Sequence, residues 1–380
     1  MNTTEHLCKL GQSIWLDKIS RTLLRSATLD KYISNYHVTG LTSNPAIFAK
    51  ALSEDELYDE AILGLAAPDK SGSDVFFELA LEDLNWAAEL FSPVHQASEG
   101  VDGWVSMDIS PLLANDANAL IREAKRLHDI AQLDNLLVNI AGNSAGLIAI
   151  EELIFAGIPI NVTLLFSSGQ YMRAASAYMR GIERRIDAGL DPKVASLASL
   201  FVSRWDVAVR DQVAAELHNK LGVAIAQRTY RAWQACIDSP RWQRLAMAGA
   251  MPQRLLWAST GCKDKALSDN YYVQELAAPS TINTMPEETL LAFGDHGLIG
   301  HTMSFDGDNA NEEIALFEAD GIDIEHLAVQ LQLEGSAAFI VSWNAILATI
   351  AQKRSTRAAR NTELDNSSGQ CAMAYRIDNA

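Results

Sequence analysis

The sequence has few cysteines and too few basic residues to balance its acidic ones. The 380 residues include only four cysteines, at positions 8, 236, 262 and 371, and none form a Cys-x-x-Cys pair. Neither a disulfide framework nor a zinc site is therefore indicated. Lysine and arginine number 30 against 48 aspartates and glutamates, a formal net charge of −18. Because this charge repels polyanions and anionic lipid, we expect no nucleic-acid and no membrane partner, and any phosphate site must be a local basic spot.

Long apolar segments are also missing. No uninterrupted run of about eighteen apolar residues occurs, and the first six residues, Met-Asn-Thr-Thr-Glu-His, lack the basic-then-apolar order of a signal peptide. We therefore expect a cytoplasmic protein. With 48% hydrophobic residues, the chain can form the full core of one large α/β domain.

Short apolar segments alternate with stretches of helical periodicity. In residues 115–128, for example, Leu120, Ala124 and Leu127 share one helical face. Eight such strand-and-helix units predict a closed (β/α)8 TIM barrel with parallel strands. The long gaps at residues 46–103 and 206–254 are expected to hold extra helices. The expected strands are residues 14–17, 38–44, 104–108, 136–140, 158–166, 200–204, 255–259 and 280–284.

The chain is predicted to form a single domain followed by a tail. Residues 1–354 form the expected barrel domain, with the last helix ending near residue 354. Residues 355–380 are polar and aperiodic, which predicts a flexible C-terminal tail.

The expected strands end in polar residues. In a parallel barrel, the carboxyl ends of the strands and the following loops carry the chemistry. Any one of these residues could be a helix N-cap, but the whole set on one rim favours a polar pocket. The set is Asp17, Asn44, Asp108, Asn139, Asn161 with Thr163, Ser199 or Arg204, Ser259 and Asn283.

Several motifs follow one another in the order of a known family. Residues 11–17 read Gly-Gln-Ser-Ile-Trp-Leu-Asp, and residues 42–48 read Thr-Ser-Asn-Pro-Ala-Ile-Phe. Residues 160–167 read Ile-Asn-Val-Thr-Leu-Leu-Phe-Ser, and residues 201–204, 257–261 and 281–286 match later strands. From about Leu10 to Lys353 the chain resembles transaldolases of the longer bacterial type. The resemblance implies a barrel whose relatives move a three-carbon dihydroxyacetone unit between sugar phosphates.

The resemblance also implies roles for individual residues, with no cofactor and a homodimeric assembly. Asp17 would be the general acid/base for a substrate hydroxyl, Asn44 and Asn161 would hold hydroxyl groups, and Thr163 would orient a water molecule. The phosphate pocket would consist of Ser199, Arg204, Ser259 and Lys263. For Arg204 the alternative is an ion pair with Asp206, and Phe201 is expected in the barrel core.

Two residues depart from the family's pattern. The lysine that forms a Schiff base in transaldolases aligns with Asn139, whose amide is neither basic nor nucleophilic. Other lysines, at positions 18, 50, 125 and 193, are expected to be poorly placed to replace it. The family's glutamate on the third strand is Asp108, which draws the carboxyl group back by about 1.5 Å.

Loss of the lysine leaves Asp17 and Asp108 without a neighbouring cation. Either repulsion raises the pKa of one carboxyl group for acid/base work, or a divalent cation binds to Asp17, Asp108, Asn139 and Asn44; no spacing motif supports a metal site.

The leading hypothesis is a transaldolase-like enzyme acting on a phosphorylated small molecule, a sugar phosphate or related polyhydroxylated carbonyl compound, by acid/base chemistry without a Schiff base. The alternative is a catalytically inactive homologue that binds a metabolite or a partner.

Overall fold

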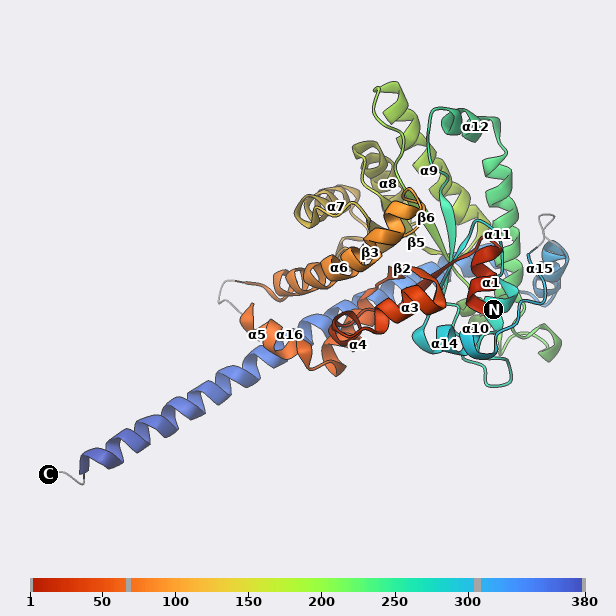
Figure 1. Ribbon diagram of the computed structural model, residues 1–380. Helices are drawn as coiled ribbons and strands as arrows, with labels where there is room; N and C mark the ends of the chain where they lie inside the picture. Colours follow the sequence, from red (N-terminus) through yellow and green to blue (C-terminus); the bar gives the residue numbers. More distant parts are fainter. Residues whose placement is uncertain (1–2, 66–69, 304–308, 378–380) are drawn as a thin grey trace.

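Eight parallel strands close into a barrel with helices around it. The computed structural model describes residues 3–65, 70–303 and 309–377, with side chains in the last helix up to residue 355. The strands pair in chain order, and β1 also pairs with β8, which closes the sheet and confirms the predicted TIM barrel (Figure 1). They are β1 (Ser13–Asp17), β2 (Val38–Thr42), β3 (Trp104–Asp108), β4 (Leu136–Ala141), β5 (Ile160–Leu165), β6 (Ser196–Phe201), β7 (Arg254–Ala258) and β8 (Ile282–Met285).

Helices follow most strands, and extra helices occupy the two long gaps as expected. After β2 come α4 (Pro45–Glu54), α5 (Leu57–Gly64) and α6 (Gly72–Ala97), and after β6 come α10 (Ser203–Val209), α11 (Leu221–Ile237) and α12 (Pro240–Met247). The remaining helices are α1 (Thr3–Lys9), α2 (Arg21–Arg25), α3 (Thr28–Tyr36), α7 (Ala117–Ala131), α8 (Ser144–Ala156), α9 (Ser168–Asp187), α13 (Tyr271–Glu275), α14 (Glu287–His296), α15 (Ala310–Ala319) and α16 (Ile324–Ile377), with 3-10 turns at Pro111–Leu113 (η1) and Ala215–Leu217 (η2).

The sixth strand begins and ends earlier than expected. Residues 196–201 form β6, whereas the sequence pattern predicted residues 200–204. Along β6, Leu197 lies in the core inside the barrel, and Ser199 and Phe201 line its mouth. The chain then enters α10 at Ser203, so Arg204 lies on a helix and not at a strand end.

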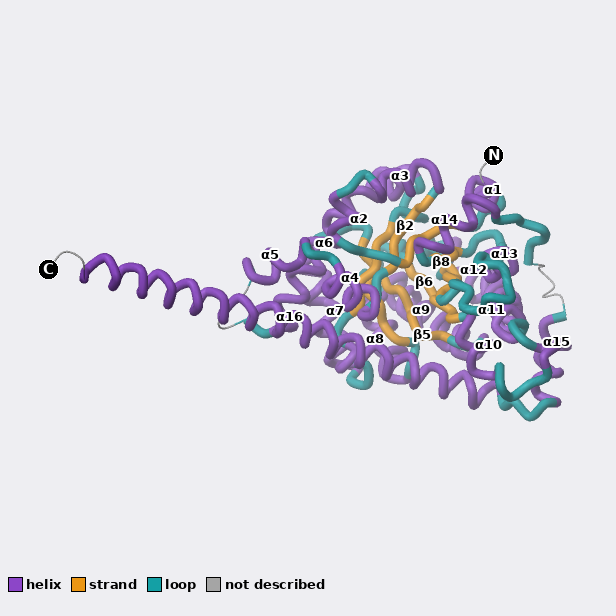
Figure 2. Tube along the Cα trace, turned by 90° about the horizontal axis from the view of Figure 1, so that it is seen from below, coloured by secondary structure: helices purple, strands orange, loops and turns teal. Residues whose placement is uncertain are grey.

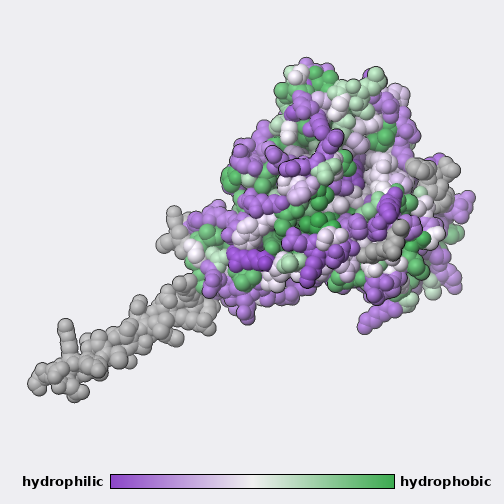
Figure 3. Space-filling model, viewed as in Figure 1, coloured by the Kyte–Doolittle hydropathy of each residue, from purple (hydrophilic) through white to green (hydrophobic). Residues whose placement is uncertain are grey.

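Apolar side chains fill the barrel in two layers. Inside the strands, Trp15, Trp104, Leu137 and neighbouring residues form one cluster, and a larger cluster lies between strands and helices. Gly40 on β2 is required here, because a Cβ atom at this position would lie 2.3 Å from the Trp15 ring. Figure 2 shows the strands enclosed by helices, and on the face seen in Figure 3 hydrophilic residues are interspersed with smaller apolar areas.

The last helix, α16, crosses the barrel and continues beyond it (Figures 1 and 2). The expected end near residue 354 is wrong, since the helix extends to Ile377; the flexibility of the tail stays a prediction. By length and composition alone, residues 324–355 could span a membrane, the one such case in the described ranges. One face of this stretch nevertheless packs into the protein core through Leu331, Trp343 and Ile346.

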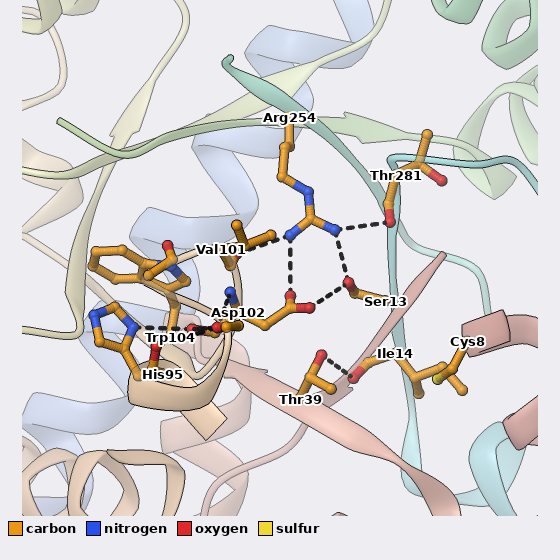
Figure 4. A network of polar contacts seen from close by, with 12 residues as sticks. Cys8, Ser13, Ile14, Thr39, His95, Val101, Asp102, Trp104, Arg254 and Thr281 are labelled. Carbon is orange, nitrogen blue, oxygen red and sulfur yellow. Dashed lines mark hydrogen bonds and ion pairs between the residues drawn. The ribbon is translucent and has the colours of Figure 1, made fainter. Parts of the chain in front are cut away.

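A polar network lies at the end of the barrel where the strands begin (Figure 4). The Arg254 guanidinium donates to Asp102 Oδ1 at 3.0 Å and to Ser13 Oγ at 2.7 Å, and Ser13 donates to Asp102 Oδ2 at 2.8 Å. Arg254 also donates to the backbone carbonyls of Val101 and Thr281. These contacts join the starts of β1, β7 and β8 to the turn before β3.

Candidate functional site

A cavity of about 190 Å³ lies at the carboxyl ends of the strands. Its wall includes every residue predicted for the site except Lys263 and Asn283. Lys263 is exposed on the loop after β7 and does not line the cavity. Asn283 also lies outside it, because Asn283 Oδ1 accepts a hydrogen bond from Thr260 at 3.0 Å and Thr284 faces the cavity instead. The predicted residues in the wall are Asp17, Asn44, Asp108, Asn139, Asn161, Thr163, Ser199, Arg204 and Ser259.

Four side chains form a hydrogen-bonded row across neighbouring strands. Ser199 Oγ donates to Asn161 Oδ1 at 2.7 Å, and Asn161 Nδ2 donates to Asn139 Oδ1 at 2.9 Å. Asn139 Nδ2 then donates to Asp108 Oδ2 at 2.9 Å. It also reaches the Ser43 carbonyl at 3.3 Å, an acceptor that fixes the orientation of the Asn139 amide. The row is possible because Asp108, Asn139 and Asn161 are in register on β3, β4 and β5.

The two carboxyl groups of the site have raised pKa values. Burial raises the pKa of Asp108 to about 7, the Asn139 hydrogen bond opposes this, and the charge of Asp17 adds to it. Burial also raises the pKa of Asp17 to about 6, against a hydrogen bond from Thr42 Oγ1 at 2.8 Å, while Glu288 raises it further. Near neutral pH this pair can hold a proton, which general acid/base catalysis requires.

Two of the phosphate-site candidates, Arg204 and Ser259, lie on the wall opposite the carboxyl pair. Arg204 places its guanidinium carbon 5.4 Å from the centre of the Phe201 ring. Burial lowers the pKa of Arg204, and the nearby Glu334 opposes this shift. Ser259 has φ +57° and its hydroxyl lies 2.8 Å from Ser203 Oγ.

The structure bears on the alternative for Arg204 and on the expectation for Phe201. Asp206 does not pair with Arg204; it accepts hydrogen bonds from Tyr272 Oη at 2.7 Å and from the Gly222 N–H at 3.1 Å. Phe201 packs against Phe166 as a core residue would, but it also lines the cavity.

Asn44 has the capping role that was the alternative for each strand-end residue. Its Oδ1 accepts from the N–H groups of Ala46 at 3.0 Å and Ile47 at 3.1 Å, so it is the N-cap of α4. Asn139 Oδ1 is likewise occupied by Asn161. Two of the four side chains proposed to bind a divalent cation, Asn44 and Asn139, therefore already use their amide oxygens. Within the described ranges no group of three or more His, Cys, Asp or Glu side chains suits a metal.

Sequence reasoning missed part of the wall. Thr42 and Ser43 precede Asn44 in the same motif, so their position at a strand end was an available signal. Ala338, Phe339 and Ser342 come from α16, which packs over the mouth. Gln332 on α16 donates to the Leu164 carbonyl at 2.9 Å, at a point where β5 departs from regular pairing and Leu164 has φ +58°. No local sequence pattern indicates this contact.

Comparison with known proteins gives a consistent result along the whole chain. The model of the Transaldolase/Fructose-6-phosphate aldolase family matches residues 14–350. A transaldolase of Renibacterium salmoninarum is 40% identical over 371 residues, covering 95% of this chain and 99% of its own length. A transaldolase of Thermobifida fusca is 40% identical to this chain, covering 92% of the chain and 97% of its own length. A transaldolase of Kocuria rhizophila is 41% identical, covering 91% of the chain and 97% of its own length.

Proposed function

This chain belongs to the Transaldolase/Fructose-6-phosphate aldolase family, and on that premise we propose that it acts on a sugar phosphate or related polyhydroxylated carbonyl compound by acid/base chemistry without a Schiff base. The observation that carries the proposal is the carboxyl pair of Asp17 and Asp108 in a polar cavity that also holds Arg204. Asn139 stands where the family resemblance places the lysine. Its amide has no nucleophilic lone pair for attack on a carbonyl.

The surroundings of the cavity support a reaction without an iminium. Within the described ranges, no lysine lines the cavity. Lys18 follows Asp17 directly, but its ammonium forms an ion pair with Glu287 on α14. Lys50, Lys18 and Asp17 all line a separate hollow. The proposal is therefore that no amine of the described residues forms a covalent intermediate.

In the proposed reaction, Asp108 and Asp17 exchange a proton with the substrate. Asn139 holds Asp108 Oδ2, so the other oxygen, Oδ1, carries or accepts the proton that reaches the cavity. Thr42 holds Asp17 Oδ1 in the same way. Arg204, with Ser199 and Ser259, binds the phosphoryl group, because a guanidinium can donate two parallel hydrogen bonds to phosphate oxygens. Asn161 and Thr163 contact substrate hydroxyl groups or water.

Thermal unfolding with fructose 6-phosphate tests the proposed site. Saturating ligand should raise the unfolding temperature by a few degrees, since about 2.7 kcal/mol is gained at a hundred times Kd. Arg204→Ala should lose this shift, whereas Arg210→Ala, which removes an exposed arginine paired with Asp264, should keep it. No shift with any phosphorylated sugar, or an undiminished shift in Arg204→Ala, contradicts the proposal.

A competing function is binding without turnover, and the asparagine at position 139 is the observation that favours it. Proton NMR of sugar phosphates mixed with the enzyme distinguishes the two. Solvent deuterium exchange or a new product supports catalysis, and binding with neither supports the inactive homologue. Cytoplasmic location and a homodimeric state remain expectations.

A further inference from the structure

The cavity carries opposite charges on opposite walls. Asp17 ends β1 and Asp108 ends β3, so the two carboxyl groups flank β2. Arg204 lies just after β6. In a closed barrel with strands in the order β1 to β8, β2 and β6 lie across from each other. A bound molecule therefore meets an acidic wall at one end and a guanidinium at the other.

Among the described residues that line the cavity, no lysine or arginine lies on the acidic wall. Of the residues described around the cavity, Arg204 is the only one with a positive charge, and it lies over Phe201. Two lysines lie in the separate hollow that Asp17 also lines: Lys18 is held by Glu287, and Lys50 lies on α4. Two carboxyl groups without a shared cation repel each other when both are ionised, and a cation bound between them removes that cost.

Polar atoms remain available on the acidic wall. Thr42 occupies one oxygen of Asp17, and Asn139 occupies one oxygen of Asp108. The second oxygen of each carboxyl group, Asp17 Oδ2 and Asp108 Oδ1, receives no hydrogen bond from any described residue. Thr163 is only 7% exposed and lines the same cavity, and its hydroxyl has no partner in the described part of the chain. The wall thus offers three acceptor atoms.

We propose that the substrate is an aminated sugar phosphate, with its ammonium group bound between Asp17 and Asp108 and its phosphoryl group bound at Arg204. This inference rests on the proposed function and names its substrate class. An ammonium group has three N–H donors, which matches the three acceptors. A divalent cation prefers six or more oxygen ligands, and the amide oxygens of Asn44 and Asn139 are already used.

Calorimetric titration with three matched ligands tests the inference. Glucosamine 6-phosphate carries the ammonium, glucose 6-phosphate has a hydroxyl in its place, and N-acetylglucosamine 6-phosphate has an uncharged amide. At pH 7 we expect the first to bind at least about tenfold more tightly than the other two. Its binding should also release protons, detected by comparing buffers of different ionisation enthalpy, because the ammonium lowers the pKa of Asp108 and Asp17.

Substitutions of the two aspartates test whether the carboxyl pair causes the preference for glucosamine 6-phosphate. Asp108→Asn and Asp17→Asn should each reduce the affinity ratio of glucosamine 6-phosphate to glucose 6-phosphate toward one. Asp269→Asn, which changes an exposed carboxylate bound to His296 outside the cavity, should keep the ratio of the parent protein.

The outcomes separate this inference from the proposed function. Equal affinity for all three ligands, weakened in Arg204→Ala, leaves the sugar phosphate site standing and overturns the ammonium site. A preference that survives in both aspartate variants also overturns it. Absence of binding by all three ligands contradicts the proposed function, and the inference fails with it.

Discussion

Asp108 is a carboxyl group whose environment favours the protonated form. Its pKa is raised to about 7 by burial and by Asp17, against about 3.9 in an unfolded chain. The folded protein therefore binds this proton more tightly than the unfolded chain. The resulting stabilisation is full below about pH 4 and is lost as the pH rises through 7.

Asp108→Asn should accordingly stabilise the protein at alkaline pH. The variant keeps an oxygen that accepts from Asn139, but it never has to carry a buried charge. The free energy of unfolding of the variant minus that of the parent protein should be about 2 kcal/mol larger at pH 8 than at pH 5. Urea unfolding at both values measures the difference, and an equal effect at the two pH values contradicts the raised pKa.

At the residue scale, the sequence predicted many of the polar residues that line the cavity. Strand ends supplied Asp17, Asp108 and Asn139, because side chains at that level of a parallel barrel converge on the mouth. Lys263 could not be placed, since the long loop after β7 directs it to the surface. The Arg204–Asp206 alternative failed because proximity in sequence does not show that Tyr272 and Gly222 already bind Asp206.

At the element scale, α16 defines part of the cavity that periodicity alone did not reveal. Its apolar residues predicted a helix but not that the helix lies across the barrel mouth and extends to Ile377. The predicted strand, residues 200–204, began later than β6 does. The small and polar residues at the start of β6, such as Ser196 and Ala198, resemble a loop, so the strand was predicted at the apolar residues that follow. Packing around the strand decides its true limits.

Gly335 lets α16 approach the barrel. A Cβ atom there would lie 2.9 Å from Leu164 Cδ2 and 3.4 Å from an Arg204 guanidinium nitrogen. Gly335→Leu should lower the free energy of unfolding by about 1–3 kcal/mol through overpacking and should weaken phosphate binding by displacing Arg204. Gly64→Leu is the matched control, because a Cβ there meets nothing within 4 Å. Wild-type stability and affinity in Gly335→Leu are inconsistent with this packing.

At the scale of the whole molecule, the two ends of the barrel have different tasks. The end where strands begin is joined by Arg254, Asp102 and Ser13 (Figure 4), whereas the other end carries the cavity. The strand and helix alternation predicted the position of the cavity, because a parallel barrel places all carboxyl ends of its strands together. It did not predict the network at the other end.

Arg254→Met should lower the stability of the fold and leave the affinity for fructose 6-phosphate nearly unchanged. It leaves the Asp102 carboxylate, 17% exposed, without its cation, which should lower the free energy of unfolding by about 2–4 kcal/mol. The Kd for fructose 6-phosphate should stay within about twofold of the parent value, because the network lies at the far end of the barrel. Chemical unfolding and calorimetry measure the two quantities. A large loss of affinity in this variant contradicts the division.

The most direct test of the central claim is borohydride reduction in the presence of fructose 6-phosphate, followed by mass spectrometry of the intact protein. A transaldolase that carries the catalytic lysine serves as the positive control, because reduction of its iminium fixes the sugar to the chain. The protein described here should keep its unmodified mass, since Asn139 cannot form an iminium. A sugar adduct on any lysine of this chain would contradict an acid/base reaction without a Schiff base.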